Sequence, residues 1–242
     1  MTLRASVASD PHRTRLADLN WRACDFYRRE LRNTPTAISY MRSRGVDGAT
    51  AARYAVGYAP AVWQGLDREF DDYRTSEDLV EAGLVAEGSR NQRYDRFRDR
   101  IMFPIADADG FIVGFGGRAL SGNTPKYLNT GETRIFQKGE ILYGEWQARQ
   151  SIAQTGEVVV VEGYLDVLAV AQLGAGNAVA PMGTALTTQQ AKRLISLAPL
   201  LLFAFDGDAA GQDAALRAAD AVLPFVDRGS GVGVITMPEG ED

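Results

Sequence analysis

The C-terminal third of this 242-residue chain alternates short apolar runs with helical patterns, and this alternation constrains its fold more than any other feature. The run Glu157-Val158-Val159-Val160-Val161 is typical of a strand covered on both faces. Further strands are expected at 177–180, 200–205 and 232–237, and helices at 164–173, 187–198 and 211–223. Strands joined through helices pair in parallel, because the helix carries the chain back to the same end of the sheet. The pattern predicts an α/β domain with a mainly parallel sheet flanked by helices.

Acidic side chains follow three of these predicted strands. Glu162 comes directly after the first strand, Asp206 and Asp208 follow the third, and Asp242 lies beyond the fourth. Ligands of open parallel sheets bind at the carboxyl ends of the strands, so these carboxylates converge if the three strands are neighbours. An oxygen-only set of this kind suits Mg²⁺ or Mn²⁺ and phosphoryl chemistry. The alternative is that Asp206-Gly207-Asp208 only marks a turn.

The sequence before about residue 150 has a different pattern. A helix is predicted over 14–45 from apolar residues at three- and four-residue spacing, with an interruption at Pro35. Two strands, 100–105 and 110–118, are expected around a turn at 107–110. This is a mixed α+β arrangement. The predicted organisation is a linker at 1–19, an α+β subdomain at 20–150 and the sheet domain at 157–242.

The charges are unevenly distributed between these two parts. Between residues 90 and 138 there are nine Lys or Arg against five Asp or Glu, whereas from 157 to 242 there are four against eleven. Arg96, Arg98 and Arg100 alternate along the chain, so on a strand they would share one face, with Tyr94 and Phe97 nearby. Such a face could follow the backbone of a nucleic acid. Ordinary solvated or salt-bridged surface is the alternative.

Composition excludes several classes of protein. No apolar run reaches the 18 residues of a membrane span, and the first 20 residues lack the apolar core of a secretory signal, so a cytoplasmic location is expected. The single cysteine and single histidine cannot form a disulfide or a four-ligand zinc site. A bound metal ion would therefore have oxygen ligands.

Several motifs together resemble the catalytic core of bacterial DnaG-type DNA primases. In the sheet domain, the segments similar to the family's TOPRIM motifs are Val160-Val161-Glu162-Gly163-Tyr164-Leu165-Asp166-Val167, Gly183-Thr184-Ala185-Leu186-Thr187 and Phe205-Asp206-Gly207-Asp208-Ala209-Ala210-Gly211. Those similar to the basic subdomain that precedes TOPRIM are residues 94–105, Gly114-Phe115-Gly116-Gly117-Arg118, Pro125-Lys126-Tyr127-Leu128-Asn129 and Phe136-Gln137-Lys138-Gly139. The upstream set is the more specific, since TOPRIM motifs also occur in topoisomerases and nucleases. The resemblance covers about residues 20 to 242.

The resemblance implies an enzyme that copies single-stranded DNA into a short RNA primer from nucleoside triphosphates. It implies that Glu162, Asp206 and Asp208 are catalytic, and that these three with Asp242 bind Mg²⁺ or Mn²⁺. Asp166 would support them or be an ordinary helix residue. The residues implied to bind nucleic acid or nucleotide are Arg96, Arg98, Arg100, Arg118, Lys126, Asn129 and Lys138.

The chain also departs from the family pattern. The zinc-ribbon domain that begins these primases is excluded by the cysteine and histidine counts, so no zinc site is expected. The TOPRIM domain is expected to be truncated at its C-terminal end, and the part that binds the replicative helicase in the family is expected to be absent. Two other functions stay open at this point: a TOPRIM nuclease, and a non-catalytic protein that binds single-stranded DNA or a replisome partner.

Overall fold

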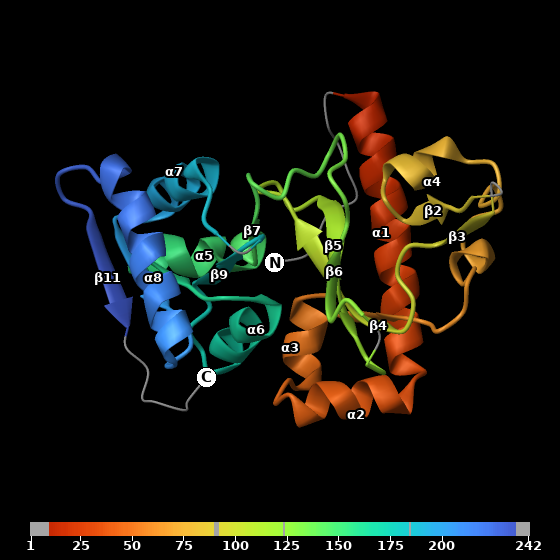
Figure 1. The fold of residues 1–242 in the computed structure, drawn as a ribbon, viewed down its shortest axis with the longest axis horizontal. Coiled ribbons are helices and arrows are strands. Elements are labelled where there is room, and N and C mark those ends of the chain that lie inside the picture. The colour runs from red at the N-terminus through yellow and green to blue at the C-terminus, as the bar shows by residue number, and fades with distance from the viewer. Residues whose placement is uncertain (1–9, 90–91, 123, 184, 236–242) are drawn as a thin grey trace. The chain divides into compact units, whose positions relative to one another are not determined.

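The computed structural model describes residues 10–89, 92–122, 124–183 and 185–235. These residues belong to two compact units, an N-terminal unit (Met1–Gln137) and a C-terminal unit (Lys138–Asp242). Both units combine helices with a sheet (Figure 1). No helix of the described residues is long and apolar enough to cross a membrane.

The N-terminal unit is organised around the long helix α1 (Pro11–Arg32). The helix begins where the Asp10 carboxylate accepts the backbone N–H of His12 at 2.9 Å, and Pro11 occupies its first turn. The predicted interruption at Pro35 is confirmed, because α1 ends at Arg32 and Pro35 begins the next helix. The remaining helices of this unit are α2 (Pro35–Ser43), α3 (Gly48–Arg53), η1 (Leu66–Arg68) and α4 (Glu77–Glu81).

A four-stranded antiparallel sheet packs against α1. In sheet order, its strands are β1 (Gly57–Ala59), β4 (Arg100–Ala106), β5 (Ile112–Ala119) and β6 (Tyr127–Asn129). A Cβ atom on Gly57 would lie 2.5 Å from Cβ of Tyr27, so glycine is what allows β1 to come this close to α1. The ring of Tyr27 also meets that of Phe115 edge-on, with centroids 5.5 Å apart, and ties α1 to the middle of the sheet.

A separate two-stranded hairpin consists of β2 (Val85–Glu87) and β3 (Arg93–Asp95). The prediction that Arg96, Arg98 and Arg100 share one face of a strand is therefore wrong. Strand β3 ends at Asp95, β4 begins at Arg100, and the two strands belong to different sheets. Between them, Asp99 has a φ of +51°, which breaks the extended conformation on which alternating side chains depend.

The C-terminal unit contains a five-stranded sheet in the order β11-β10-β8-β9-β7. Its strands are β7 (Leu142–Tyr143), β8 (Glu157–Val160), β9 (Ala178–Pro181), β10 (Leu200–Ala204) and β11 (Gly231–Ile235). Its helices are α5 (Glu145–Thr155), α6 (Tyr164–Gln172), α7 (Thr188–Leu197), α8 (Ala209–Val222) and η2 (Leu223–Phe225). Only β7 pairs antiparallel, with β9, so the prediction of a mainly parallel sheet is confirmed.

A cluster of buried apolar residues covers one face of this sheet. Val158 and Val160 of β8 are level with Leu201 and Phe203 of β10, and all four are buried. They pack with apolar side chains of α5, α7 and α8. This packing fixes the register of β8 and β10, and with it the positions of the residues that follow each strand.

Candidate active site

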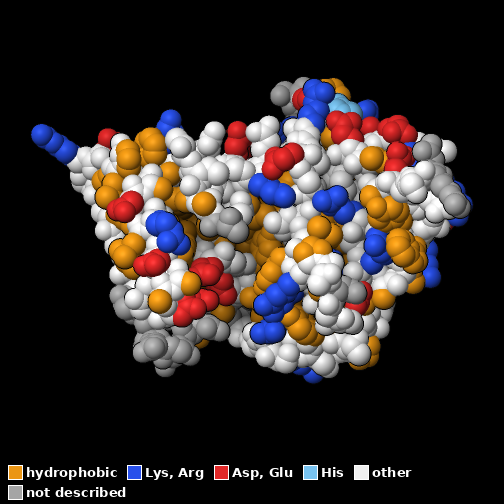
Figure 2. Space-filling model, in the orientation of Figure 1, with side chains coloured by type: hydrophobic (Ala, Val, Ile, Leu, Met, Phe, Trp, Pro, Cys, Tyr) orange, Lys and Arg blue, Asp and Glu red, His pale blue; other side chains and the backbone are white. Residues whose placement is uncertain are grey.

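The structure brings two of the predicted acidic residues together at the carboxyl ends of β8 and β10. Strand β10 lies between β8 and β11, as convergence of the carboxylates required. Glu162 follows β8, Asp206 follows β10, and the backbone N–H of Asp206 donates to Oε1 of Glu162 at 3.1 Å. Acidic side chains gather on this unit near α6 in the space-filling view (Figure 2). The arrangement is an acidic edge at the place where open parallel sheets bind ligands.

Asp208 begins helix α8. Its Oδ1 accepts the backbone N–H of Gly211 at 2.7 Å, which makes it the N-cap of the helix. A Cβ atom on Gly211 would lie 2.3 Å from the carbonyl oxygen of Asp206, so glycine allows the first turn of α8 to lie directly against Asp206. One carboxylate oxygen of Asp208 thus has a structural role at the start of α8, as the alternative interpretation of this segment as a turn would have it. The second oxygen of the same carboxylate can still bind a cation.

The electrostatics of Glu162 reflect its acidic neighbours. Partial burial raises the pKa of its carboxyl above the ordinary value, and the negative charges of Asp206, Asp166 and Asp208 act in the same direction. The N–H donated by Asp206 opposes this rise by stabilising the ionised form. Three carboxylates therefore act on the charge of Glu162, and a divalent cation bound beside it would offset their repulsion.

Asp166 supports the segment that carries Glu162. Its Oδ2 accepts the backbone N–H of Gly163 at 2.8 Å, so it closes the turn between β8 and α6. Sequence reasoning left open whether Asp166 supports the site or is an exposed helix residue, and this contact favours support. Asp242, the fourth predicted metal ligand, lies outside the described residues.

Three of the predicted arginines of the N-terminal unit bind the protein itself. Arg100 is 5% exposed and donates to the carbonyl oxygen of Pro125 at 2.9 Å, and burial lowers the pKa of its guanidinium. Arg96 donates to the carbonyl oxygen of Asn129 at 3.1 Å. Arg118 is 6% exposed and donates to the hydroxyl of Tyr127. Together these contacts tie the edge strand β6 and the loop before it to the rest of the sheet.

The remaining predicted residues of this group lie on or beside loops. Lys126 is exposed immediately before β6, and Asn129 is the last residue of that strand. Lys138 is the first residue of the C-terminal unit, and its carbonyl oxygen accepts a hydrogen bond from Nε2 of Gln190 at 2.9 Å.

Sequence reasoning missed Trp63, which stacks on a predicted residue. The guanidinium carbon of Arg98 lies 4.3 Å from the centroid of the Trp63 ring and 5.1 Å from that of Tyr94. The side chain of Trp63 is 65% exposed, although tryptophan is usually well buried. We call Trp63, Tyr94 and Arg98 the aromatic–arginine stack. Trp63 is 35 residues from Arg98 in sequence, so no spacing in the sequence connects the two residues.

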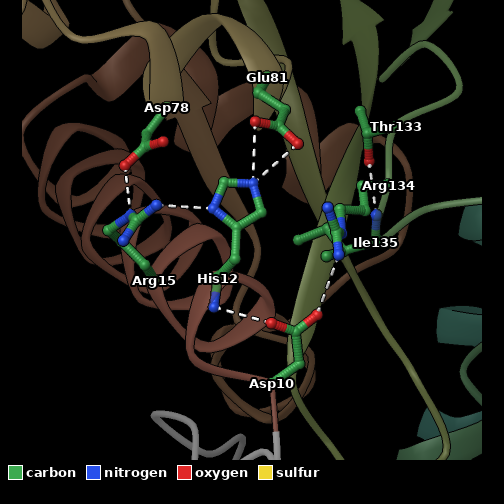
Figure 3. A network of polar contacts seen from close by, with 8 residues as sticks. All are labelled: Asp10, His12, Arg15, Asp78, Glu81, Thr133, Arg134 and Ile135. Carbon is green, nitrogen blue, oxygen red and sulfur yellow. Dashed lines mark hydrogen bonds and ion pairs between the residues drawn. The ribbon is translucent and has the colours of Figure 1, made fainter.

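A polar network at the start of α1 holds the histidine of the chain (Figure 3). Nε2 of His12 lies 2.9 Å from Glu81, and its Nδ1 lies 2.6 Å from the Arg15 guanidinium, which also pairs with Asp78. Among the described residues, His12, Asp78 and Glu81 have potential metal ligands within 4.8 Å of one another. The Arg15 cation bridges two of these three residues, so the network is an ion-paired clamp between α1 and α4 as it stands.

Comparisons with known proteins identify both units. Residues 26–149 match the family model described as the DNA primase catalytic core, N-terminal domain, and residues 156–235 match the Toprim domain model. A DNA primase of Pseudomonas aeruginosa is 46% identical over 225 residues, which are 91% of this chain and 34% of that protein. The chain thus spans about a third of the length of this curated relative.

Solved structures of primase cores have the same fold. The crystal structure of a DNA primase domain from Pseudomonas aeruginosa aligns with a TM-score of 0.87 at 46% identity, covering 94% of this chain and 72% of that one. The structure of the DnaG primase catalytic domain bound to ssDNA aligns with a TM-score of 0.85 at 39% identity, covering 96% and 76%. The fold, both family models and this level of identity agree, and the chain belongs to the family of bacterial DnaG-type DNA primases.

Proposed function

We propose that this chain is the catalytic core of a primase, which synthesises short RNA primers from nucleoside triphosphates on single-stranded DNA. The observation that carries the proposal is the acidic edge. There Glu162 accepts the backbone N–H of Asp206, and the charges of Asp206, Asp166 and Asp208 help to raise the pKa of its carboxyl. Phosphoryl transfer needs positioning and charge stabilisation more than covalent chemistry, and carboxylates that hold divalent cations supply both. Membership of the primase family selects polymerisation among the reactions such a site could perform.

Glu162, Asp206 and Asp208 would hold Mg²⁺ or Mn²⁺, with Asp242 as a further ligand. The fit rests on the donor set, which is all carboxylate oxygen, and on the pKa of Glu162, which partial burial raises and which the charges of Asp206, Asp166 and Asp208 raise further. When bound, the cation would stabilise charge on the attacking hydroxyl and on the leaving pyrophosphate. The chain's own contribution is to fix the carboxylates: Asp208 through its cap on α8, and Glu162 through the N–H of Asp206.

The N-terminal unit would bind the single-stranded template. The aromatic–arginine stack offers an exposed ring on which bases can stack and a cation for the phosphate backbone. Lys126 is exposed beside β6 and would add a phosphate contact. A relative's catalytic domain has been solved bound to ssDNA, which supports the same ligand here. Arg96, Arg100 and Arg118 would act on the template mainly by holding β6 in place.

Lys138 would contact the triphosphate of the incoming nucleotide, since a compact ammonium is suited to phosphate. The other partners in this proposal are the growing RNA primer and, as for the family, a replicative helicase. Replication of a bacterial chromosome would place the protein in the cytoplasm. These assignments rest on the family and on the residues that match its motifs.

The test is Mg²⁺- or Mn²⁺-dependent incorporation of labelled ribonucleotides on single-stranded DNA. Glu162→Gln and Asp206→Asn should each reduce synthesis at least about 100-fold, because each removes a charge that holds the cation. The matched control is Asp220→Asn, which alters an exposed carboxylate near the C-terminal end of α8, about three turns from Asp208. Synthesis that survives both substitutions would disprove the metal site, and cleavage of labelled DNA without synthesis would show a nuclease instead.

A second control separates the two groups of candidate metal ligands. Mn²⁺ binding, measured by electron paramagnetic resonance, should be lost in Glu162→Gln and kept in His12→Ala, because His12 belongs to an ion-paired clamp rather than to the acidic edge. The opposite result would place the cation at the start of α1.

A further inference from the structure

Asp95 is a buried carboxylate in the N-terminal unit, apart from the acidic edge, and its oxygens accept hydrogen bonds from uncharged donors. It is the last residue of β3 and only 2% exposed. The hydroxyl of Tyr73 donates to its Oδ1 at 2.8 Å, and the backbone N–H of Leu66 donates to its Oδ2 at 3.0 Å. Burial raises the pKa of its carboxyl to about 6, and the hydrogen bonds from Tyr73 and Leu66 oppose that rise.

The backbone of Asp95 joins the same region to the aromatic–arginine stack. Its N–H donates to the carbonyl oxygen of Trp63 at 2.8 Å, and its carbonyl oxygen accepts from the Arg98 guanidinium. One residue thus contacts both ends of the stack and, through Leu66, the segment that follows Trp63. Both contacts with the stack are made by the backbone of Asp95. Its buried carboxylate fixes that backbone through the hydrogen bonds from Tyr73 and Leu66, because a buried carboxylate must keep its oxygens paired.

The stack itself has little to hold it in place. The Trp63 side chain is 65% exposed, and its ring contacts Tyr94 edge-on with centroids 5.7 Å apart. An exposed ring on a loop moves with the loop unless the backbone that carries it is fixed. A surface for bases must be fixed in advance, because ordering it on binding would reduce affinity.

We propose that Asp95 is a positioning residue, which holds Trp63 and Arg98 together as a preformed stacking surface for the bases of single-stranded DNA. This inference rests on the proposed function of the N-terminal unit as the template-binding part. Asp95 acts through the segment of Trp63 and Leu66 and through Arg98, and does not itself touch the nucleic acid. Its two carboxylate oxygens accept hydrogen bonds from the Tyr73 hydroxyl and the Leu66 N–H. An apolar residue in its place would leave both donors without an acceptor.

The experiment compares Asp95→Ala with Asp95→Asn, an isosteric variant that keeps one acceptor oxygen. The position of Trp63 is measured first in protein without DNA, as acrylamide quenching of tryptophan fluorescence. The signal of Trp63 is isolated by subtracting the matched protein that carries Trp63→Phe, since the chain has two other tryptophans. Asp95→Ala should change the quenching of Trp63, and Asp95→Asn should retain most of the original value. Unchanged quenching in a folded Asp95→Ala protein overturns the proposal.

Binding is measured next, by fluorescence anisotropy with a labelled single-stranded oligodeoxynucleotide. Trp63→Ala and Asp95→Ala should each weaken binding about 5- to 100-fold, the range expected for loss of one stacked base. The double variant should bind no more weakly than Trp63→Ala alone, because both changes disable one surface. Multiplicative losses would mean that Asp95 acts elsewhere and would overturn the proposal.

One further variant and one comparison keep the outcomes distinct. Tyr73→Phe removes one hydrogen-bond donor to Asp95 and keeps the ring, so it tests the same contact if Asp95→Ala does not fold. This variant should change the quenching of Trp63 in the same direction by a smaller amount. Unchanged quenching would count against the proposal. If Trp63→Ala binds DNA like the unaltered protein, the template assignment of the stack fails, even where the fluorescence shows that Asp95 fixes Trp63.

Discussion

Among single residues, Glu162 shows how a site can oppose the stability of its own fold. Its carboxyl is partly buried, and three carboxylates in its surroundings raise its pKa. The unfolded chain has no such neighbours, so the ionised form of Glu162 is less favourable in the folded state than in the unfolded one. Residues that bind a cation commonly destabilise the protein without it, which is the usual conflict between activity and stability.

The substitution Glu162→Gln should therefore stabilise the metal-free protein at neutral pH. The folded-state pKa of Glu162 lies above its unfolded value, so its contribution favours folding at low pH and is lost as the pH rises through the folded-state pKa. The gain should be no more than about 1 kcal/mol, because the carboxyl is largely screened by solvent. Thermal melting in a chelator, measured from about pH 4 to pH 8, should show the variant's advantage only at the higher pH. A lower melting temperature of the variant at neutral pH would contradict this account.

At the scale of elements, helix α7 and the segment that begins the C-terminal unit are joined by one side chain. Gln190 is fully buried, and its Nε2 donates to the carbonyl oxygens of Lys138 and Ile141 at 2.9 and 3.1 Å. Its Oε1 accepts the backbone N–H of Thr187, and the Thr187 hydroxyl accepts the backbone N–H of Gln190, so the two residues form a capping box at the start of α7. The cap of α7 thus also positions Lys138, a residue proposed to bind the nucleotide.

The substitution Gln190→Leu should reduce the free energy of unfolding by about 2 to 4 kcal/mol, because it leaves buried carbonyl and amide groups without partners. The control is Gln189→Leu, the same change at the exposed neighbouring position, which should alter stability by less than about 0.5 kcal/mol. Denaturant unfolding of both variants measures the difference. Equal stabilities would show that water satisfies the groups that Gln190 binds.

The elements also show what could be predicted from the sequence. Periodicity predicted the strands β8, β10 and β11, and the residues at the strand ends predicted that Glu162 and Asp206 would meet if these strands were neighbours, as the sheet order shows that they are. Those signals are local, because each strand is indicated by the apolar run of its own residues.

The aromatic–arginine stack could not be predicted in the same way. It depends on where β3 ends, and that is decided by the distant contacts of Asp95 and by the positive φ of Asp99. The partners of Arg98 and Arg100 come from loops 25 to 35 residues away, so no spacing rule could separate an arginine that stacks on the surface from one that is buried.

At the scale of the whole molecule, the net charge of −5 hides a basic N-terminal part and an acidic C-terminal part. The affinity of a protein for single-stranded DNA falls with salt in proportion to the number of phosphates it neutralises. Not every arginine of the basic part should contribute to this dependence. Arg100 donates to the carbonyl oxygens of Pro125, Lys126 and Gly117 and is buried, whereas Lys126 is exposed.

Substituting these two residues should therefore have opposite effects on binding and stability. Lys126→Ala should lower the slope of log Kd against log salt by about 0.7, the value for one phosphate contact on a single strand, and leave the unfolding free energy nearly unchanged. Arg100→Ala should keep the slope and reduce stability by about 1 to 3 kcal/mol, because buried carbonyl oxygens lose their donor. Anisotropy titrations across a range of salt, with denaturant unfolding of the same proteins, measure both quantities. A reduced slope in a stable Arg100→Ala protein would mean that the Arg100 guanidinium leaves its carbonyl partners to bind phosphate, and that β6 and the loop before it rearrange when the template is bound.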